Sequence, residues 1–172
     1  MFEVTILGSN GAMPAYGRLP SAQYLQIQNH HFLIDCGEGT QLQLMKYQLP
    51  FQKINHIFIS HLHGDHYLGL MGLLFSMQLL GRKNDLHLYS IKGLDEIITL
   101  QLRHSRSALA YPVHFHKLEY GRLTVFENDQ LSVTTLPLRH KVPCCGFLFR
   151  EKPKPRNINK KKLNPGMRLQ DI

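Results

Sequence analysis

The sequence has few cysteines and lacks an apolar run long enough to cross a membrane. Its three cysteines, Cys36, Cys144 and Cys145, are an odd number, and two are neighbours whose Cα atoms lie about 3.8 Å apart, below the usual disulfide range. The longest apolar stretch, residues 67–80, falls short of the roughly 20 residues of a membrane span. The start of the chain resembles no signal peptide. We therefore expect no disulfide framework and no membrane contact, and a cytoplasmic location.

Acidic residues are also scarce. The chain carries 20 Lys and Arg against 12 Asp and Glu, which gives a formal net charge of +8. Most of the excess lies in residues 150–172, which also contain three prolines and show no apolar periodicity. We expect residues 151–172 to form a basic arm or linker, either suited to a polyanion or simply solvated. Residues 1–150 then form the folded part, as a length of 172 residues and 43% hydrophobic content predict.

The spacing of apolar residues predicts strands that alternate with helices early in the chain and follow one another later. We expect strands at residues 2–7, 24–28, 32–34, 54–60, 86–90, 115–118, 123–127, 131–136 and 146–150. We expect helices at residues 38–47, 67–80 and 94–103. This order predicts a mixed α/β layered domain with helices covering a face of at least one sheet.

The segment HLHGDH, which begins at His61, places three imidazoles and one carboxylate within six positions, between an expected strand and an expected helix. In an extended segment, side chains two residues apart point the same way, so His61 and His63 can address one ion. The turn that Gly64 permits directs Asp65 and His66 toward another point. Nitrogen ligands with a carboxylate suit zinc, and manganese or iron are alternatives. The pattern predicts a metal site rather than a histidine-rich solvent loop.

The remaining histidines give weaker signals. His114 and His116 alternate along an expected strand without a neighbouring carboxylate, which favours an ordinary strand face over a second site. Five more are isolated from other ligand types and are expected to be surface or core residues: His30, His31, His56, His87 and His104.

Several segments together carry a resemblance to known proteins. HxHxDH after an apolar strand resembles the signature of the metallo-β-lactamase superfamily of metal-dependent hydrolases. The segments LGSNGAMPAYGRLPSA, LIDCGEGTQLQL, IFISHLHGDHYLGL and PLRHKVPCCGFLF are together similar to ribonuclease Z, the endonuclease that trims the 3′ trailer from transfer RNA precursors. The similarity runs over nearly the whole chain. It implies an α/β metallo-β-lactamase-type αβ/βα sandwich, and this chain matches the N-terminal half of that four-layer fold.

The resemblance implies a role for each site residue. His61, His63 and His140 would hold one zinc ion, and Asp65 with His66 would supply ligands for a second. Asp65 would also accept the proton when water attacks the phosphodiester. Two zinc ions close together can bring the pKa of a bridging water into the neutral range and neutralise charge on the substrate. The resemblance also implies precursor tRNA as substrate and a homodimer as the assembly.

The roles of four further features stay open. Asp35 either fixes the tautomer of a ligating imidazole from behind or caps the next helix. The turn at residues 9–18 is either the loop that the family places beside the scissile bond or a plain strand connection. The apolar helix 67–80 either contributes to a dimer interface or is buried within the sandwich. The segment KPRN at residues 154–157 resembles a basic loop near the RNA path of the family, although Lys152 stands where a proline is expected.

One departure from the family bears on activity. The family's second zinc also needs a later aspartate and a later histidine, whereas this chain has no histidine after His140 and only Asp171 as a later aspartate. The family is also considerably longer, so either the native chain continues past residue 172, which we favour, or the gene encodes a fragment. The 172 residues nearly complete one metal site and leave the other half-built. We therefore expect the fragment by itself to be weakly active or inactive.

The function that these observations favour is a zinc-dependent endoribonuclease that acts on transfer RNA precursors. A second interpretation is a hydrolase of the same superfamily that acts on a small substrate, such as a cyclic nucleotide or an ester. A third is a non-catalytic fragment that binds RNA or a partner, for which salt-dependent RNA binding without cleavage would be typical.

Overall fold

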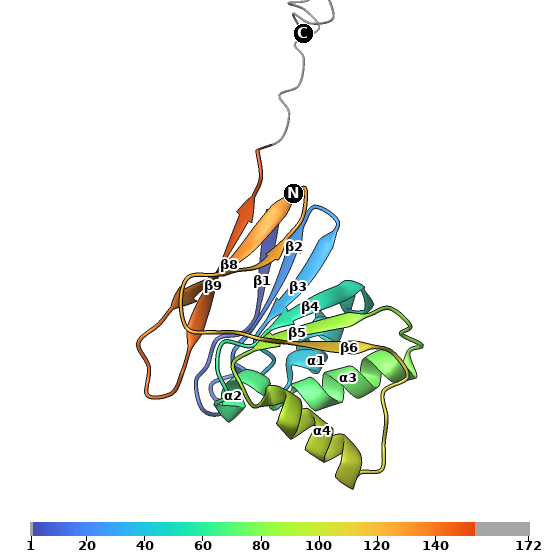
Figure 1. Cartoon of the computed structure of the whole chain (residues 1–172). Helices are drawn as coiled ribbons and strands as arrows, with labels where there is room; N and C mark the ends of the chain where they lie inside the picture. Colours follow the sequence, from blue (N-terminus) through green and yellow to red (C-terminus); the bar gives the residue numbers. More distant parts are fainter. Residues whose placement is uncertain (1, 154–172) are drawn as a thin grey trace, which may run out of the picture.

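The computed structural model describes residues 2–153 and contains a six-stranded sheet with the strand order β1-β2-β3-β4-β5-β6 (Figure 1). Strands β1 to β3 pair antiparallel, and β3 to β6 pair parallel. The bounds are β1 (Phe2–Gly8), β2 (Ala22–Ile27), β3 (His30–Ile34), β4 (Ile54–Phe58), β5 (Leu86–Ser90) and β6 (Val113–Lys117). Parallel neighbours need a crossover connection, which helices supply here.

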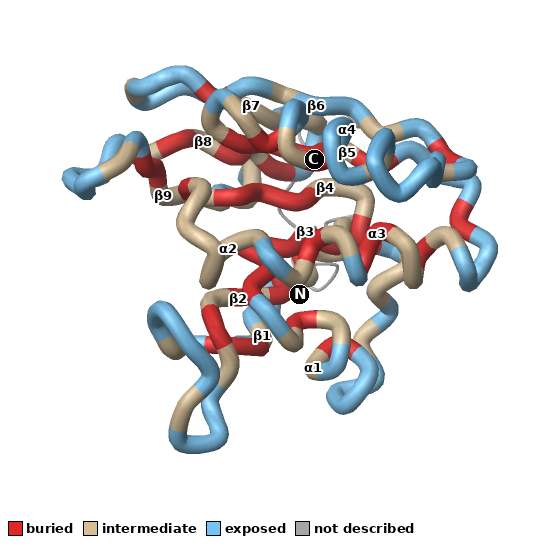
Figure 2. Tube along the Cα trace, turned by 90° about the horizontal axis from the view of Figure 1, so that it is seen from below, coloured by how far each residue is buried: buried red, intermediate tan, exposed pale blue. Residues whose placement is uncertain are grey.

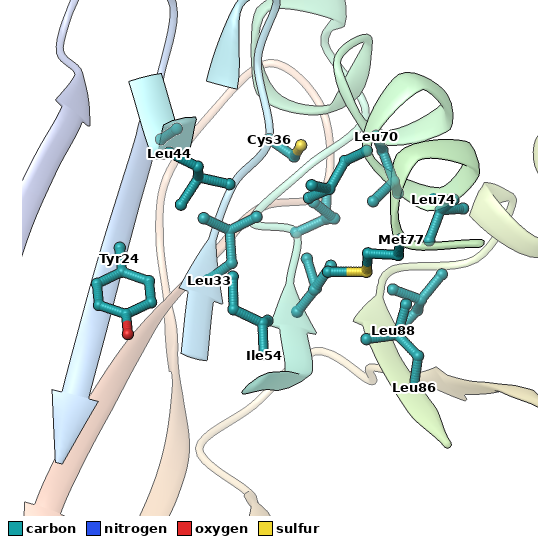
Figure 3. Packing of buried hydrophobic residues seen from close by; sticks show 14 of the residues in the cluster. Tyr24, Leu33, Cys36, Leu44, Ile54, Leu70, Leu74, Met77, Leu86 and Leu88 are labelled. Carbon is teal, nitrogen blue, oxygen red and sulfur yellow. The ribbon is translucent and has the colours of Figure 1, made fainter. Parts of the chain in front are cut away.

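Helices lie against one face of this sheet (Figure 1). Their bounds are α1 (Thr40–Lys46), the 3-10 helix η1 (Phe51–Lys53), α2 (Gly64–Tyr67), α3 (Leu70–Leu79) and α4 (Leu94–His104). Leu44 of α1, Leu73 of α3 and Ile98 of α4 belong to one buried cluster with Leu33 and Ile57 of the strands. The helices therefore share a continuous apolar core with the sheet, as Figure 3 shows for part of this cluster.

A second sheet covers the opposite face. It consists of β7 (Thr124–Glu127), β8 (Leu131–Pro137) and β9 (Cys145–Glu151), paired antiparallel in that order. A second buried cluster joins Phe32 and Phe58 of the large sheet to Leu131 and Val133 of β8. The described residues thus form three successive layers, which are helices, a six-stranded sheet and a three-stranded sheet.

Burial on both faces explains the apolar runs of the central strands. In β5, Leu86 and Leu88 point into the helix-side cluster, whereas Tyr89 belongs to the cluster under the second sheet. Figure 2 shows that buried residues follow the strands, while exposed residues gather on the outer loops and helices. A strand that is covered on both faces loses the polar alternation of a half-exposed strand.

Arg82 is a charged residue inside this core, with 4% of its surface exposed. Burial lowers the pKa of its guanidinium. The guanidinium donates at 2.6–3.1 Å to five oxygens: the backbone carbonyls of Gln52, Ile54, Asn84 and Asp85, and Oδ1 of Asn55. These bonds connect η1, the start of β4 and the start of β5. Because the donors are matched by acceptors, the charge is tolerated at this depth.

The structure agrees with most of the expected elements, with boundaries that differ by at most three residues. The expected helix at 67–80 is divided, because α2 ends at Tyr67 and α3 begins at Leu70. Four α3 residues are buried inside the chain: Leu70, Leu73, Leu74 and Met77. Their burial accounts for one side of α3, but Leu79 of the same helix is 83% exposed, so both interpretations of this helix stay open and the homodimer stays a prediction. No helix within residues 2–153 has the length and apolarity needed to span a membrane.

The expected domain boundary at residue 150 falls within β9, which ends at Glu151. The backbone N–H of Lys152 still donates to the Gln130 carbonyl at 2.8 Å. Residues 154–172 of the expected arm, including the basic segment KPRN at 154–157, lie outside the described residues, so the arm stays a prediction.

Candidate metal centre

The candidate site lies at the carboxyl edge of the parallel strands, where open α/β sheets commonly bind ligands. The HLHGDH segment follows β4, and Asp35 follows β3 directly. Their backbones are joined, because Asp35 N–H donates to the Phe58 carbonyl at 2.8 Å and Cys36 N–H donates to the His66 carbonyl at 2.7 Å. Two segments that are separate in the sequence therefore form one edge of the site.

Three imidazoles converge at this edge. Nε2 of His61 lies 3.1 Å from Nδ1 of His63, which lies 3.2 Å from Nε2 of His140. The ring planes of each pair are inclined by 73–74°, so the rings radiate from a common point rather than stack. Zinc held by nitrogens at about 2.0–2.1 Å in tetrahedral geometry needs nitrogens about 3.3 Å apart. The spacing and the chemistry of these three donors therefore fit zinc.

His140 comes from the loop between β8 and β9, far from the HLHGDH segment in sequence. Within residues 2–153, His61, His63 and His140 are the one group of at least three ligand-type residues whose donor atoms all lie within 4.8 Å of one another. Burial, together with the neighbouring imidazoles, lowers the pKa of His61 to about 4. His61 is thus a neutral imidazole at pH 7, the form that binds metal.

Asp35 is the buried carboxylate behind this group, with 4% of its surface exposed. Its Oδ1 accepts the Ser60 backbone N–H at 2.8 Å. Its Oδ2 accepts the hydroxyls of Ser21 at 3.0 Å and Ser60 at 3.1 Å, and lies 2.6 Å from Nδ1 of His66. The N-cap of α1 is Gly39, without a side-chain cap bond. Of the two interpretations of Asp35, the structure shows a contact behind an imidazole and no helix cap.

His66 and Asp65 form a second pair beside the three imidazoles. Nε2 of His66 lies 3.5 Å from Oδ2 of Asp65, while Nδ1 of His66 is occupied by Asp35. Burial lowers the pKa of His66, but the hydrogen bond and the charge of Asp35 outweigh it, so the pKa is raised overall. Burial raises the pKa of Asp65, but the Ala12 N–H and nearby imidazoles outweigh it, so this pKa is lowered overall. Asp65 is therefore a carboxylate at neutral pH.

The loop at residues 9–18 lies against this second pair. The backbone N–H of Ala12, a residue with a φ of 55°, donates to Oδ2 of Asp65 at 2.9 Å. Asn10 shapes the loop from within, because its side-chain amide donates to the Met13 carbonyl at 2.6 Å. The loop is thus more than a strand connection, since it contributes a hydrogen bond to a site carboxylate.

Two glycines allow the halves of this edge to approach closely, a role that sequence reasoning missed. A Cβ at Gly69 would lie 2.2 Å from the Gly37 carbonyl oxygen, and a Cβ at Gly37 would lie 2.4 Å from the Asp65 carbonyl oxygen. The Gly69 N–H donates to the Cys36 carbonyl at 2.9 Å across this contact. Backbone meets backbone here, and any side chain would push the segments apart. The glycines inside LIDCGEGT and YLGL were the available signal.

Cys144 is another residue that sequence reasoning did not place at the site. Its Sγ lies 3.7 Å from Nδ1 of His61, which also lies 3.0 Å from Oγ of Ser60. Burial raises the pKa of the Cys144 thiol, so the thiol is neutral at pH 7. Cys144 and Ser60 therefore both contact the ring nitrogen of His61 that faces away from the other two imidazoles.

The structure adds contacts of the other histidines that the linear sequence does not show. His114 has a carboxylate partner, because its Nε2 lies 2.9 Å from Oδ2 of Asp85. His56 and His87 are not isolated, because their rings stack at 5.0 Å and Nδ1 of His87 lies 2.9 Å from Nε2 of His116. Strand register is the cause, since it aligns His56 with His87 and His87 with His114. Burial, then the His87 imidazole, lowers the pKa of His56 to about 3.

Comparison with known proteins places this geometry in context. The family model described as Anti-Pycsar protein Apyc1 matches residues 2–154. The chain belongs to this family. It is also 51% identical over 172 residues to the ribonuclease Z of Cytophaga hutchinsonii, covering 99% of this chain and 55% of that protein. The resemblance to ribonuclease Z is confirmed, and the chain spans about half the length of the curated relatives it matches.

Solved structures establish the fold. The short form of human tRNase Z is 33% identical with a TM-score of 0.77, covering 86% of this chain and 64% of that one. The metallo-β-lactamase fold protein YhfI from Bacillus subtilis is 22% identical with a TM-score of 0.67, covering 86% of this chain and 56% of that one. The expected fold class is confirmed, and the chain has the metallo-β-lactamase fold.

Proposed function

We propose that this chain is the metal-binding half of a ribonuclease Z-type endoribonuclease, which removes the 3′ trailer from transfer RNA precursors. The observation that carries the proposal is the convergence of His61, His63 and His140 at one sheet edge, in a chain that is 48–51% identical to ribonucleases Z. A phosphodiester is a chemically suitable substrate, because metal centres of this type neutralise the charge that hinders attack on it.

The donor set favours zinc as the metal. Three imidazoles, two pairs of which have nitrogens 3.1 and 3.2 Å apart, leave a fourth position open, as catalytic zinc sites do. A bound ion would lower the pKa of a water molecule and neutralise charge on the attacked phosphodiester. Manganese and iron remain alternatives, because imidazole also suits them.

The chain's own residues would hold the metal ions and orient the side chains that bind them. His61, His63 and His140 would bind the first ion. Asp35 accepts a hydrogen bond from Nδ1 of His66, which leaves Nε2 of His66 for a second ion beside Asp65. Asp65 would accept a proton during the attack, and the Ala12 N–H holds its carboxylate in place.

The second ion would lack part of its ligand set in this chain, because no histidine follows His140. We infer that the 172 residues bind one ion tightly and cleave RNA slowly. A chain that also carried the missing ligands would cleave at the full rate. The homodimer that the resemblance implies, and the cytoplasmic location expected from the cysteines and the start of the chain, belong to this proposal as well.

Metal binding and single-turnover cleavage together test the proposal. The 172-residue chain would be loaded with zinc, its metal content measured by mass spectrometry, and an excess of protein incubated with a precursor tRNA carrying a labelled 3′ trailer. We expect about one ion per chain and slow cleavage at the trailer junction. His63→Ala should abolish both, whereas His104→Ala, a change on the exposed end of α4, should leave both unchanged.

Other results would overturn the proposal in recognisable ways. Hydrolysis of bis(p-nitrophenyl) phosphate or a cyclic nucleotide without any trailer cleavage would establish the small-substrate hydrolase. Steeply salt-dependent RNA binding with no cleavage at all, even with metal bound, would establish the non-catalytic fragment. If His63→Ala left the metal content unchanged, the three imidazoles would not be the metal site.

A further inference from the structure

A cavity with a volume of about 370 Å³ lies next to the candidate metal centre. Lys92 follows β5, Lys117 ends β6, and Cys144 lies just before β9, so the cavity opens at the same sheet edge as the three imidazoles. Cys144 is a shared wall, because its Sγ lies 3.7 Å from His61 Nδ1 and it also lines a hollow with Asp35 and His66. A ligand in the cavity would therefore lie beside the metal centre.

The lining combines an apolar floor with a positive rim. Leu118, which is 5% exposed, contributes to the floor together with Pro143. The ammonium groups of Lys92 and Lys117 exceed the one carboxylate of Glu119, so the cavity carries a net positive charge. Anionic ligands are favoured by such a rim, whereas flat apolar groups are favoured by such a floor.

Tyr120 adds a stacking surface to this lining. Tyr120 lines the cavity and is 80% exposed, so most of its surface is free to contact a ligand. Exposed aromatic rings beside basic side chains are the elements with which proteins bind single-stranded nucleotides, since any base can stack and any phosphate can pair with lysine. A nucleotide has both a flat base and an anionic phosphate.

We propose that this cavity is a nucleotide subsite, in which Tyr120 and the apolar floor take the base while Lys92 and Lys117 take a phosphate. Because the cavity lies beside the metal centre, we assign it to a nucleotide adjacent to the bond that is cleaved. This last assignment rests on the proposed function, whereas nucleotide binding does not. The subsite would hold a substrate strand by shape and charge next to the metal ligands.

Calorimetric titration of the metal-free 172-residue chain with cytidine monophosphate tests the subsite directly. We expect Lys92→Gln combined with Lys117→Gln to weaken binding at least tenfold. Tyr120→Ala should weaken it about fivefold or more, the range found when a stacking aromatic is removed. The matched control combines Lys46→Gln with Lys53→Gln, which makes the same change in charge at two lysines that do not line the cavity. Circular dichroism confirms that each variant is folded.

Two probes separate a nucleotide site from a simple anion site. Cytidine should bind more weakly than its monophosphate because it lacks the contact with the lysines, and inorganic phosphate should bind more weakly because it lacks the base. Equal binding of phosphate and cytidine monophosphate would overturn the subsite. If the Lys92 and Lys117 double variant bound cytidine monophosphate as tightly as the control variant does, the subsite would be overturned as well.

Comparison with the metal-site variant keeps this inference distinct from the proposed function. His63→Ala should lose metal and retain nucleotide binding. If wild-type protein leaves precursor RNA intact but binds the nucleotide through Lys92 and Lys117, the proposed function fails and the subsite stands. If the lysine double variant cleaves the trailer and binds nucleotide like the control, the subsite fails and the proposed function stands.

Discussion

Replacement of Asp35 by Asn puts an amide of the same shape in place of the carboxylate behind His66. The remaining carbonyl oxygen can still accept the Ser60 N–H, but an amide NH₂ now faces Nδ1 of His66 in place of a carboxylate oxygen. An amide that donates requires Nδ1 to be an acceptor, so the proton of a neutral imidazole moves to Nε2. That nitrogen faces Asp65 at 3.5 Å and is the one proposed to bind metal.

The expected magnitude follows from the bonds that change. A hydrogen bond to a charged group contributes about 1.5–3 kcal/mol, and a neutral one contributes about 0.5–1.5 kcal/mol. Asp35→Asn should therefore lower the free energy of unfolding by about 1–2 kcal/mol near pH 6. A raised pKa in the folded state contributes stability that is fully present below the unfolded value of 6.5 and is lost as pH rises through the folded value. The cost of the variant should accordingly be smaller at pH 8.5.

Two measurements check this reasoning. NMR titration of the metal-free protein should show the His66 pKa lower in Asp35→Asn than in wild type, because the variant removes the charge and the hydrogen bond that raise it. Urea unfolding at pH 6 and pH 8.5 gives the two stabilities, with Asp129→Asn in an exposed loop as the control. An unchanged His66 pKa, or an equal loss at both pH values, would refute the role assigned to Asp35.

Three further predictions concern the core and the site. Arg82→Met should lower the free energy of unfolding by about 3–5 kcal/mol, since it leaves several buried oxygens without donors; a loss below about 1 kcal/mol in urea would contradict this. Gly69→Ala should lower both the melting temperature and the zinc affinity because its Cβ would meet the Gly37 carbonyl, whereas Gly11→Ala, where a Cβ meets nothing within 4 Å, should do neither. The pKa of His56 is lowered to about 3, so between pH 7 and pH 5 a proton binds His56 in the unfolded chain and not in the folded chain. The free energy of unfolding should therefore fall by about 2 kcal/mol from pH 7 to pH 5. Thermal scans should show a weaker dependence of stability on pH in His56→Phe.

Strands and helices were predictable because their signals are local. The run at 54–60 is apolar because β4 is covered by helices on one face and by the second sheet on the other. The division of the helix at 67–80 was not predictable, since it coincides with a tertiary contact in which the Gly69 N–H donates to the Cys36 carbonyl. The histidines of β4, β5 and β6 appeared isolated because strand register, which aligns His56 with His87, is absent from a linear sequence.

The sequence by itself determined the identity of the candidate metal site, because His61, His63, Asp65 and His66 lie within six consecutive positions and need no folding to be neighbours. The pairing of His140 with them came from resemblance, and the β8–β9 loop of the folded chain brings it to 3.2 Å from His63. Tertiary structure alone decided which groups surround these ligands. Asp35, Cys144 and the Ala12 N–H each reach the site from a different element, and only the packing of two sheets and their loops places such distant groups within hydrogen-bonding range.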